Sequence, residues 1–205
     1  WDDHQNKIIN NWQEIVREED TVLVLGDTSW GMNMNEAKED LDIINNLPGK
    51  KVFIKGNHDF WWSSLNKLKS TYEEISFLQN SYYKYGNIGI CGTRGWLCPN
   101  EVKFDKDDEK IYKREQLRLK MSLDSAVKDG CDELIVITHY PPTNDKLETS
   151  EFTKIYEEYN VKKVIYGHLH GKESFEMGLR GERNGVEYIL ASSDYIDFKP
   201  IKIIE

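Results

Sequence analysis

The stretch Lys51-Val52-Phe53-Ile54-Lys55-Gly56-Asn57-His58-Asp59 places a short apolar run directly before a glycine and three polar side chains. Residues 51–55 favour a strand buried on both faces, because such strands carry a continuous apolar pattern rather than an alternating one. The polar side chains follow at the point where that strand is expected to end. This combination of a buried strand and a polar end is the pattern around which the rest of the chain is organised.

Three further apolar runs end in the same way: residues 21–25 before Gly26-Asp27, residues 133–138 before His139, and residues 163–166 before Gly167-His168-Leu169-His170. Apolar residues at helical spacing predict helices at residues 6–18, 35–47, 64–72, 110–128 and 152–159. Shorter strands are expected at residues 82–85 and 88–91, and residues 185–205 alternate like an antiparallel hairpin. Buried strands that alternate with helices predict an α/β domain whose sheets are sandwiched between helical layers.

The bulk composition limits the classes of protein to consider. A chain of 205 residues, 39% hydrophobic and 31% charged, fits one globular domain spanning residues 1–205. No apolar run approaches the roughly 20 residues that a membrane helix needs, so no membrane partner is expected. The net charge of −9 argues against a broad nucleic-acid surface. It leaves a phosphorylated substrate open, because bound divalent cations reverse the sign of the local field.

The cysteines bear on the compartment. Cys91, Cys98 and Cys131 show neither CxxC spacing nor an even count, so they are expected to be free thiols in a reducing compartment. No signal peptide is visible at the start of the chain. We therefore expect a cytoplasmic protein.

The polar residues at the strand ends form a set that suits metal binding: Asp27, Asn57, His139, His168 and His170. The carboxyl ends of strands in α/β folds meet at one edge of the sheet, so these side chains are expected to converge. Four of the five histidines lie at such ends, which is hard to reconcile with unrelated core or surface histidines.

The donor types restrict the metal. Imidazole suits zinc and iron, whereas carboxylate and amide oxygens suit manganese and magnesium. A mixed nitrogen and oxygen set without thiolate argues against a structural zinc site. A carboxylate able to bridge two ions suits a binuclear centre, in which the ions lie about 3.5–4 Å apart and clamp the oxygens of a phosphoryl transfer. Two divalent ions, of manganese, iron or zinc, are therefore expected.

These motifs resemble the calcineurin-like metallophosphoesterases, in which D-x-H, G-D, G-N-H-[DE], a lone His and G-H-x-H each follow a strand. The matching positions are Gly26-Asp27, Gly56-Asn57-His58-Asp59, His139 and Gly167-His168-Leu169-His170. The resemblance implies a sandwich of two mixed β-sheets flanked by helices. It also implies hydrolysis of a phosphomonoester or phosphodiester by metal-bound hydroxide, with a phosphorylated small molecule or a nucleotide as the substrate.

The resemblance also implies a role for each site residue. Asp27 corresponds to the carboxylate that bridges the two ions. Asn57, His139 and His168 would complete the second ion, and His170 would join the first. His58 is similar to the catalytic histidine of the family, which stabilises or protonates the leaving oxygen, and Asp59 would orient it.

The first family motif is where the chain departs from the pattern. Asp2-Asp3-His4 fits D-x-H formally, yet no apolar strand precedes it. One interpretation makes Asp2 and His4 metal ligands. The favoured interpretation makes this segment a lead-in to the first helix, in a domain that lacks its first strand because the true motif lies upstream.

Arg94 and several aromatic residues have two interpretations each. Arg94 follows a strand and either contacts a substrate phosphate or is a turn arginine held by surface carboxylates. Trp30, Trp61 and Trp62 follow the metal motifs and either line the cleft or pack helices onto a sheet. Tyr140, next to His139, has the same two possibilities.

Three other functions remain open on the sequence. The same site would also hydrolyse nucleotide-type anhydrides. A catalytically silent metal-binding or scaffolding module is favoured by the missing D-x-H motif and opposed by the intact Asn57-His58-Asp59 triplet. A nuclease is disfavoured because the sequence shows no basic stripe.

Overall fold

The structure is a computed structural model, and it describes every residue except 101, 103 and 205. Among the described residues the strands form two sheets. The smaller sheet has the order β1-β2-β3, and its strands are β1 (Thr21–Val24), β2 (Lys50–Phe53) and β3 (Ile75–Phe77). Both of its strand pairs are parallel.

The larger sheet has the order β4-β5-β6-β7-β9-β8. Its strands are β4 (Tyr82–Tyr85), β5 (Ile88–Thr93), β6 (Glu133–Thr138), β7 (Lys163–Tyr166), β8 (Gly181–Arg183) and β9 (Val186–Leu190). The central pairs from β5 to β9 are parallel, and β4 and β8 pair antiparallel at the two edges. This sheet is therefore mixed, as expected for both sheets, whereas the described strands of the smaller sheet are all parallel.

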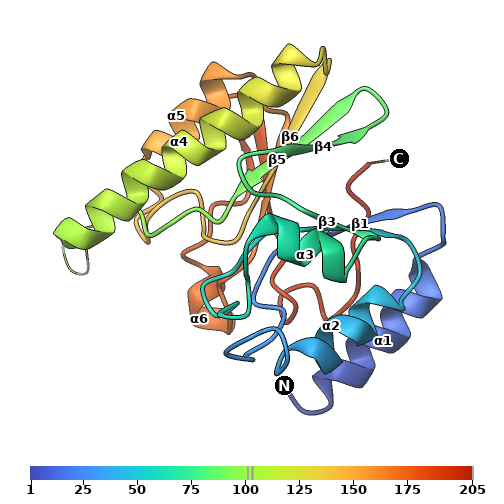
Figure 1. Cartoon of the computed structure of the whole chain (residues 1–205). Coiled ribbons are helices and arrows are strands. Elements are labelled where there is room, and N and C mark those ends of the chain that lie inside the picture. The colour runs from blue at the N-terminus through green and yellow to red at the C-terminus, as the bar shows by residue number, and fades with distance from the viewer. Residues whose placement is uncertain (101, 103, 205) are drawn as a thin grey trace.

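Helices cover the outer faces of both sheets (Figure 1). The helices α1 (His4–Ile15), α2 (Lys38–Asn45) and α3 (Leu65–Thr71) lie beside the smaller sheet. The helices α4 (Lys106–Lys128) and α5 (Glu151–Glu158) lie against the larger one. A single turn, α6 (Lys172–Phe175), follows the last histidine motif. The predicted α/β sandwich flanked by helices is confirmed.

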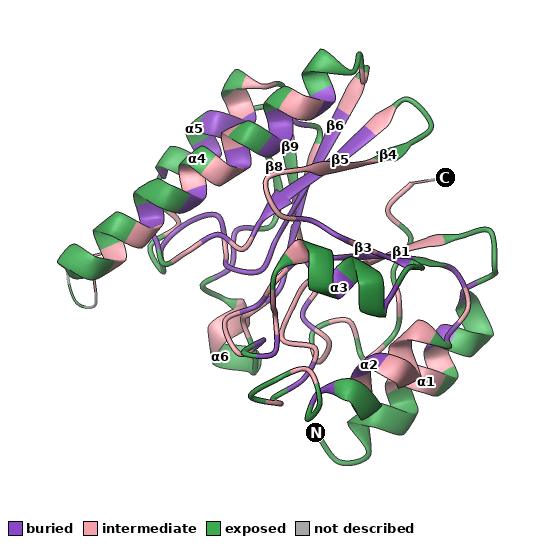
Figure 2. Ribbon diagram, viewed as in Figure 1, coloured by how far each residue is buried: buried purple, intermediate pink, exposed green. Residues whose placement is uncertain are grey.

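Three apolar clusters account for these layers. The cluster between the two sheets includes Val52, Ile54, Ile135 and Ile165. Another joins the larger sheet to α4 and α5, and a third joins the smaller sheet to α2 and α3. Figure 2 shows the result, with buried strands inside and helices exposed only on their outer faces. The strands β2, β5, β6 and β7 are buried on both faces, which explains their continuous apolar runs.

Some sequence-based boundaries were wrong. β3 and α6 were not predicted, because each is too short to show a period. The hairpin was placed at residues 185–205, but it consists of β8 and β9 and turns at Asn184 and Gly185, which both have positive φ. Asn-Gly at such positions is the usual two-residue hairpin turn. Of the residues beyond Leu190, Ile203 and Ile204 pack against the cluster between the sheets.

The acidic residues 105–109 start α4, which therefore begins before the helix expected at residues 110–128. Asp105 is the N-cap and forms a capping box with Asp108. Carboxylates in a first turn also interact favourably with the helix dipole.

The three cysteines are free, as expected. In the described part of the chain, no helix combines the length and the apolar character needed to cross a membrane.

Candidate metal centre

Two glycines bring the first ligand loops together. β1 and β2 lie side by side, and Gly26 and Gly56 follow their ends. A Cβ on Gly26 would overlap the Gly56 nitrogen, and a Cβ on Gly56 would overlap the Asp27 carboxylate. Gly26 also has a φ of +89°, which favours glycine. The close approach of the two backbones places Asp27 next to Asn57.

The Asp59 carboxylate ties the same two loops together. It accepts hydrogen bonds from the N–H groups of Gly56 at 2.7 Å, Asp27 at 2.9 Å and Thr28 at 2.8 Å, and from the Trp61 indole at 2.9 Å. Burial raises the pKa of Asp59, and these N–H groups oppose that effect. The described hydrogen bonds of Asp59 fix the backbone that carries Asp27 and do not reach the His58 ring, so its orientation of that ring stays a prediction.

Donor atoms from three strand ends converge beside these loops. Ligand atoms of Asp27, His139 and His168 all lie within 4.8 Å of one another. The Asn57 Oδ1 lies 2.7 Å from His139 Nε2 and 3.0 Å from His168 Nδ1. His139 Nε2 also lies 3.1 Å from His168 Nδ1 and 3.4 Å from the Asp27 carboxylate. The structure thus brings together four of the five residues predicted to bind metal.

The hydrogen bonds of His139 show what this cluster suits. Its Nδ1 lies 2.8 Å from the carbonyl oxygen of Leu25, so Nδ1 carries the hydrogen and, in neutral imidazole, Nε2 presents a lone pair. That lone pair faces the Asn57 amide oxygen and the Asp27 carboxylate, which are also acceptors. Acceptors that face one another in a half-buried site repel unless a cation lies among them, so the residues present fit a divalent metal ion.

The protonation preferences of the donors are consistent with this. Burial raises the pKa of Asp27, but the hydrogen bond and charge that His139 supplies when its ring is protonated, together with the hydrogen bonds from His58, outweigh burial and hold this pKa well below its usual value. Burial lowers the pKa of His168 to about 4, and the charge of His139 contributes. An ionised carboxylate and a neutral imidazole are the forms that bind metals.

Two residues of the site have left-handed backbone. Asp27 has a φ of 52° and His168 a φ of 68°, and neither is a glycine. Left-handed backbone costs about 1–3 kcal/mol for such residues and persists where the surroundings enforce it. Tyr140 packs on the His168 ring at 4.3 Å between centroids. Of the two interpretations of Tyr140, this contact favours the one in which it lines the site.

His58 lies at the open side of the centre. Its Nδ1 is 2.9 Å from the Asp27 carboxylate, and its side chain is 36% exposed. The Trp30 ring stacks on it at 4.2 Å between centroids, although Trp30 is itself 71% exposed. Trp61, by contrast, is buried in the cluster under α2 and α3. Of the two interpretations of these tryptophans, lining the site applies to Trp30 and packing applies to Trp61.

His170 lies outside the three-residue group. Its Nδ1 contacts the Asp194 carboxylate at 2.8 Å, and Asp194 also accepts the Gly171 N–H at 2.9 Å. Asp194 was missed in the sequence. It lies four residues beyond the end of β9, and the misplaced hairpin concealed that strand end.

The first residues of the chain belong to the lead-in of α1. His4 is the first residue of that helix, and its Nδ1 lies 2.9 Å from the Trp1 carbonyl oxygen. Asp2 and His4 are exposed, and neither belongs to the metal-binding group. The Trp1 ring packs edge-on against His170 at 5.0 Å, so this segment borders the centre through its tryptophan.

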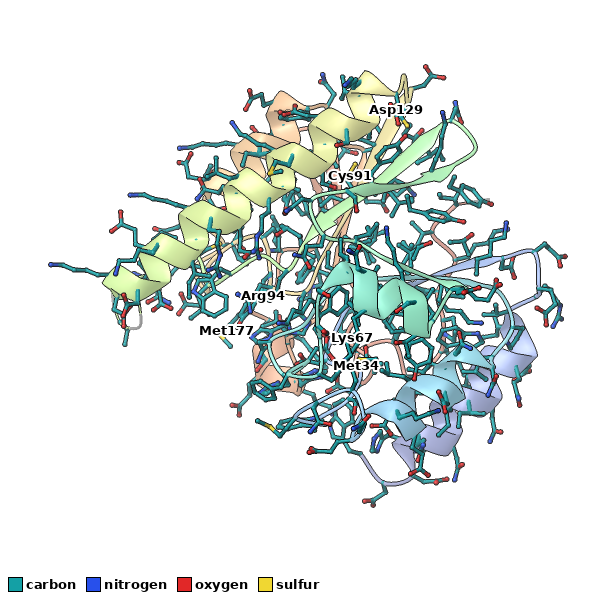
Figure 3. The ribbon with its side chains drawn as sticks, viewed as in Figure 1. Met34, Lys67, Cys91, Arg94, Asp129 and Met177 are labelled. Carbon is teal, nitrogen blue, oxygen red and sulfur yellow. The ribbon has the colours of Figure 1, made fainter. Side chains whose placement is uncertain are left out.

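The Arg94 guanidinium contacts neither the side chains of Asp27, His139 and His168 nor the surface carboxylates of the simpler interpretation. Its guanidinium lies 4.5 Å from the centre of the Trp96 ring and 4.0 Å from the buried carboxylate of Glu115. Figure 3 shows it in the region between α4 and α3.

Comparisons with known proteins agree with this picture. The family model described as calcineurin-like phosphoesterase matches residues 1–172. A stretch of 52 residues is 42% identical to the uncharacterized protein MJ1445 of Methanocaldococcus jannaschii, and it covers 25% of this chain and 28% of that protein. The crystal structure of AQ665 from Aquifex aeolicus, a protein of unknown function, superposes with a TM-score of 0.53.

The AQ665 superposition covers 98% of this chain and 82% of the other at 21% identity, so it supports the fold alone. The family model spans most of the chain and includes every residue of the metal-binding group. The chain belongs to the calcineurin-like phosphoesterase family.

Proposed function

We propose that this chain hydrolyses a phosphomonoester or a phosphodiester in a reaction that depends on two divalent metal ions. The observation that carries the proposal is the convergence of Asp27, Asn57, His139 and His168, in which the His139 lone pair faces two other acceptors. Such a donor set suits a catalytic centre rather than a closed structural site, because it lacks thiolates.

The donors divide into two groups in this proposal. Asn57, His139 and His168 would hold one ion, His170 would contribute to the other, and Asp27 would bridge them. The ions would supply Lewis-acid activation of water and charge neutralisation at phosphorus. Asp194 holds the His170 ring in position through Nδ1, as carboxylates commonly do for metal-binding histidines.

His58 assists departure of the leaving group. Its ring is held between the Asp27 carboxylate and the Trp30 indole, and the exposed part of the ring is accessible to a substrate. The protonated imidazole donates a proton to the leaving oxygen. Asp59 contributes by fixing the Asp27 backbone rather than by contacting His58.

The test measures hydrolysis of p-nitrophenyl phosphate and bis-p-nitrophenyl phosphate with manganese. We expect manganese-dependent turnover that Asp27→Ala and His58→Ala each reduce at least 100-fold, the lower end for a lost general acid. The preferred substrate distinguishes a monoesterase from a diesterase. Calorimetric titration with manganese is run in parallel. Metal binding without turnover of either ester would replace this proposal with the scaffolding function.

A further inference from the structure

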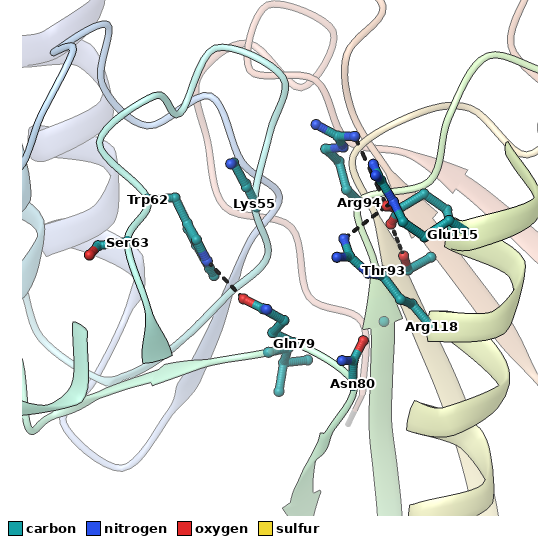
Figure 4. Close-up of a pocket in the computed structure, with 12 residues that line it drawn as sticks. Lys55, Trp62, Ser63, Gln79, Asn80, Thr93, Arg94, Glu115 and Arg118 are labelled. Atoms are coloured by element: carbon teal, nitrogen blue, oxygen red, sulfur yellow. Dashed lines mark hydrogen bonds and ion pairs between the residues drawn. The ribbon is translucent and has the colours of Figure 1, made fainter. Parts of the chain in front are cut away.

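A cavity of about 310 Å³ lies between the two sheets and under α4. Its walls come from the end of β2, the segment after β3, the end of β5 and the inner face of α4. In Figure 4, Lys55 and Trp62 face it from one side, and Arg94, Glu115 and Arg118 face it from the other. Its volume falls in the range of roughly 300–1,000 Å³ that is usual for small-molecule sites.

The charge of this cavity is opposite to that of the whole chain. Four cations line it, Lys55, Arg94, Arg114 and Arg118, together with one carboxylate, Glu115, which gives a formal charge of +3. The chain as a whole carries −9. Like charges gathered in a partly buried cavity destabilise one another, so their convergence calls for an anionic partner.

Glu115 organises these cations but does not neutralise them. It is 1% exposed and lies 2.9 Å from Arg118, 3.4 Å from Arg114 and 4.0 Å from Arg94. Its other oxygen accepts the Thr93 hydroxyl hydrogen at 2.6 Å. The single carboxylate therefore holds three guanidinium groups in place, and their remaining N–H groups stay available to another acceptor.

Two groups in the cavity have donors to spare. The Arg94 Nε is buried and has no hydrogen-bond partner among the described residues. No carboxylate of the described residues lies within ion-pair distance of Lys55. Both would gain from an oxyanion in the cavity.

The cavity and the metal centre share two backbone segments. Lys55 precedes the metal-binding Asn57 by two residues. The Arg94 carbonyl oxygen accepts the N–H of His139 at 3.1 Å and that of Tyr140 at 3.0 Å. A ligand held by Lys55 and Arg94 would therefore lie next to a substrate bound at the centre.

We propose that this cavity binds a phosphate-type oxyanion and that the anion is a second phosphate group of the substrate. The second half of this inference rests on the proposed function. Arginine forks match the oxygens of phosphate, and Lys55 adds a point charge. The substrate class becomes a compound with two phosphate groups, one hydrolysed at the metal centre and the other held between Lys55 and the arginines.

The first experiment measures calorimetric binding of inorganic phosphate to the Asp27→Ala variant in EDTA, so that the metal centre contributes nothing. We expect saturable binding with one site. Adding Lys55→Met or Arg118→Met should weaken it about tenfold or more, which is the usual effect of losing one charged hydrogen bond. Lys120→Met is the matched control, because Lys120 lies on the same helix but pairs with Glu158 outside the cavity.

The outcomes separate cleanly. Absence of binding, or equal weakening by Lys120→Met, would overturn the inference. Thermal unfolding midpoints show whether each variant is folded. Lys55→Met is less liable to disturb the fold, because Lys55 makes no ion pair with the described residues.

The second experiment identifies the source of the anion. It compares kcat/KM for a short alkyl bisphosphate and for the corresponding monophosphate. We expect a preference for the bisphosphate that Lys55→Met lowers about tenfold. Phosphate binding without such a preference overturns the second half and assigns the cavity to a free oxyanion. Phosphate binding without turnover of either ester means that the proposed function fails while the cavity site stands.

Discussion

The Asp59 carboxylate accepts the backbone N–H of Asp27 at 2.9 Å. Asp59, in the loop after β2, therefore fixes Asp27, in the loop after β1. The same oxygen accepts the Gly56 N–H at 2.7 Å. A buried carboxylate with several N–H donors is a strong and rigid interaction. The positions of Asp27, His139 and His168 therefore depend on Asp59, whose side chain contacts only Asp27 among them.

Replacing Asp59 tests this dependence. Asp59→Ala leaves the N–H groups of Gly56, Asp27 and Thr28 without an acceptor in a buried place. We expect the free energy of unfolding, measured in urea, to fall by roughly 3–5 kcal/mol. Calorimetric manganese affinity should fall as well. Asp107→Asn, at an exposed ion pair on α4, is the control and should change little. An unchanged manganese affinity in Asp59→Ala would contradict the role described.

Much of this arrangement was predictable from the sequence, because buried strands with polar ends specify both the sheets and the edge where ligands meet. Asn57, His139 and His168 follow directly from that rule. The role of Asp59 and the contribution of Asp194 were not predictable. Each depends on which hydrogen-bond partner a carboxylate meets in three dimensions, and no sequence period reports that. The cavity around Glu115 was missed for the same reason, since its cations come from separate elements.

Gly56→Ala tests the close approach of the two ligand loops. The added Cβ would overlap the Asp27 carboxylate, so Asp27 has to move away from the other donors. We expect manganese affinity to fall at least tenfold, since a displaced ligand loses most of its contribution. Gly130→Ala is the control, because a Cβ there meets no atom within 4 Å. It should cost about 1 kcal/mol for its positive φ and leave manganese binding unchanged. Equal affinities in the two variants would exclude the steric argument.

Trp30 and Trp61 should respond in opposite ways to truncation. Trp30 is 71% exposed and stacks on His58, whereas Trp61 is 2% exposed and fills the core beside α3. Trp61→Ala should lower the free energy of unfolding by roughly 3–5 kcal/mol. Trp30→Ala should lower it by less than about 1 kcal/mol, while it reduces kcat for ester hydrolysis because the His58 ring loses one of its walls. Urea unfolding and steady-state kinetics on both variants measure the contrast. A loss of free energy of unfolding in Trp30→Ala as large as in Trp61→Ala would contradict it.

Acid should destabilise the metal-free protein through His168. Burial holds the pKa of this imidazole at about 4, below the 6.5 of an exposed histidine. A depressed pKa means that the unfolded chain binds the proton first. The contribution of neutral His168 to the free energy of unfolding is therefore fully present above pH 6.5, and it is lost as the pH falls toward 4. Between pH 6.5 and 5 the loss should be roughly 1–2 kcal/mol in urea unfolding with EDTA. His168→Asn should flatten this slope, and an equal slope in that variant would assign the effect elsewhere.

Asp194 tests whether the residue missed in the sequence belongs to the metal centre. Its carboxylate contacts His170 Nδ1 at 2.8 Å, which leaves Nε2 as the nitrogen available to a metal and fixes the ring that carries it. Asp194→Asn keeps the size of the side chain but removes its charge, and it should weaken manganese binding by about 10–100-fold in calorimetry. Asp197→Asn, at an exposed carboxylate three residues further along, makes the same charge change and should leave the affinity unaltered. If the two variants bind manganese equally, His170 is held by Asp194 for structural reasons, and its assignment to the first ion loses its support.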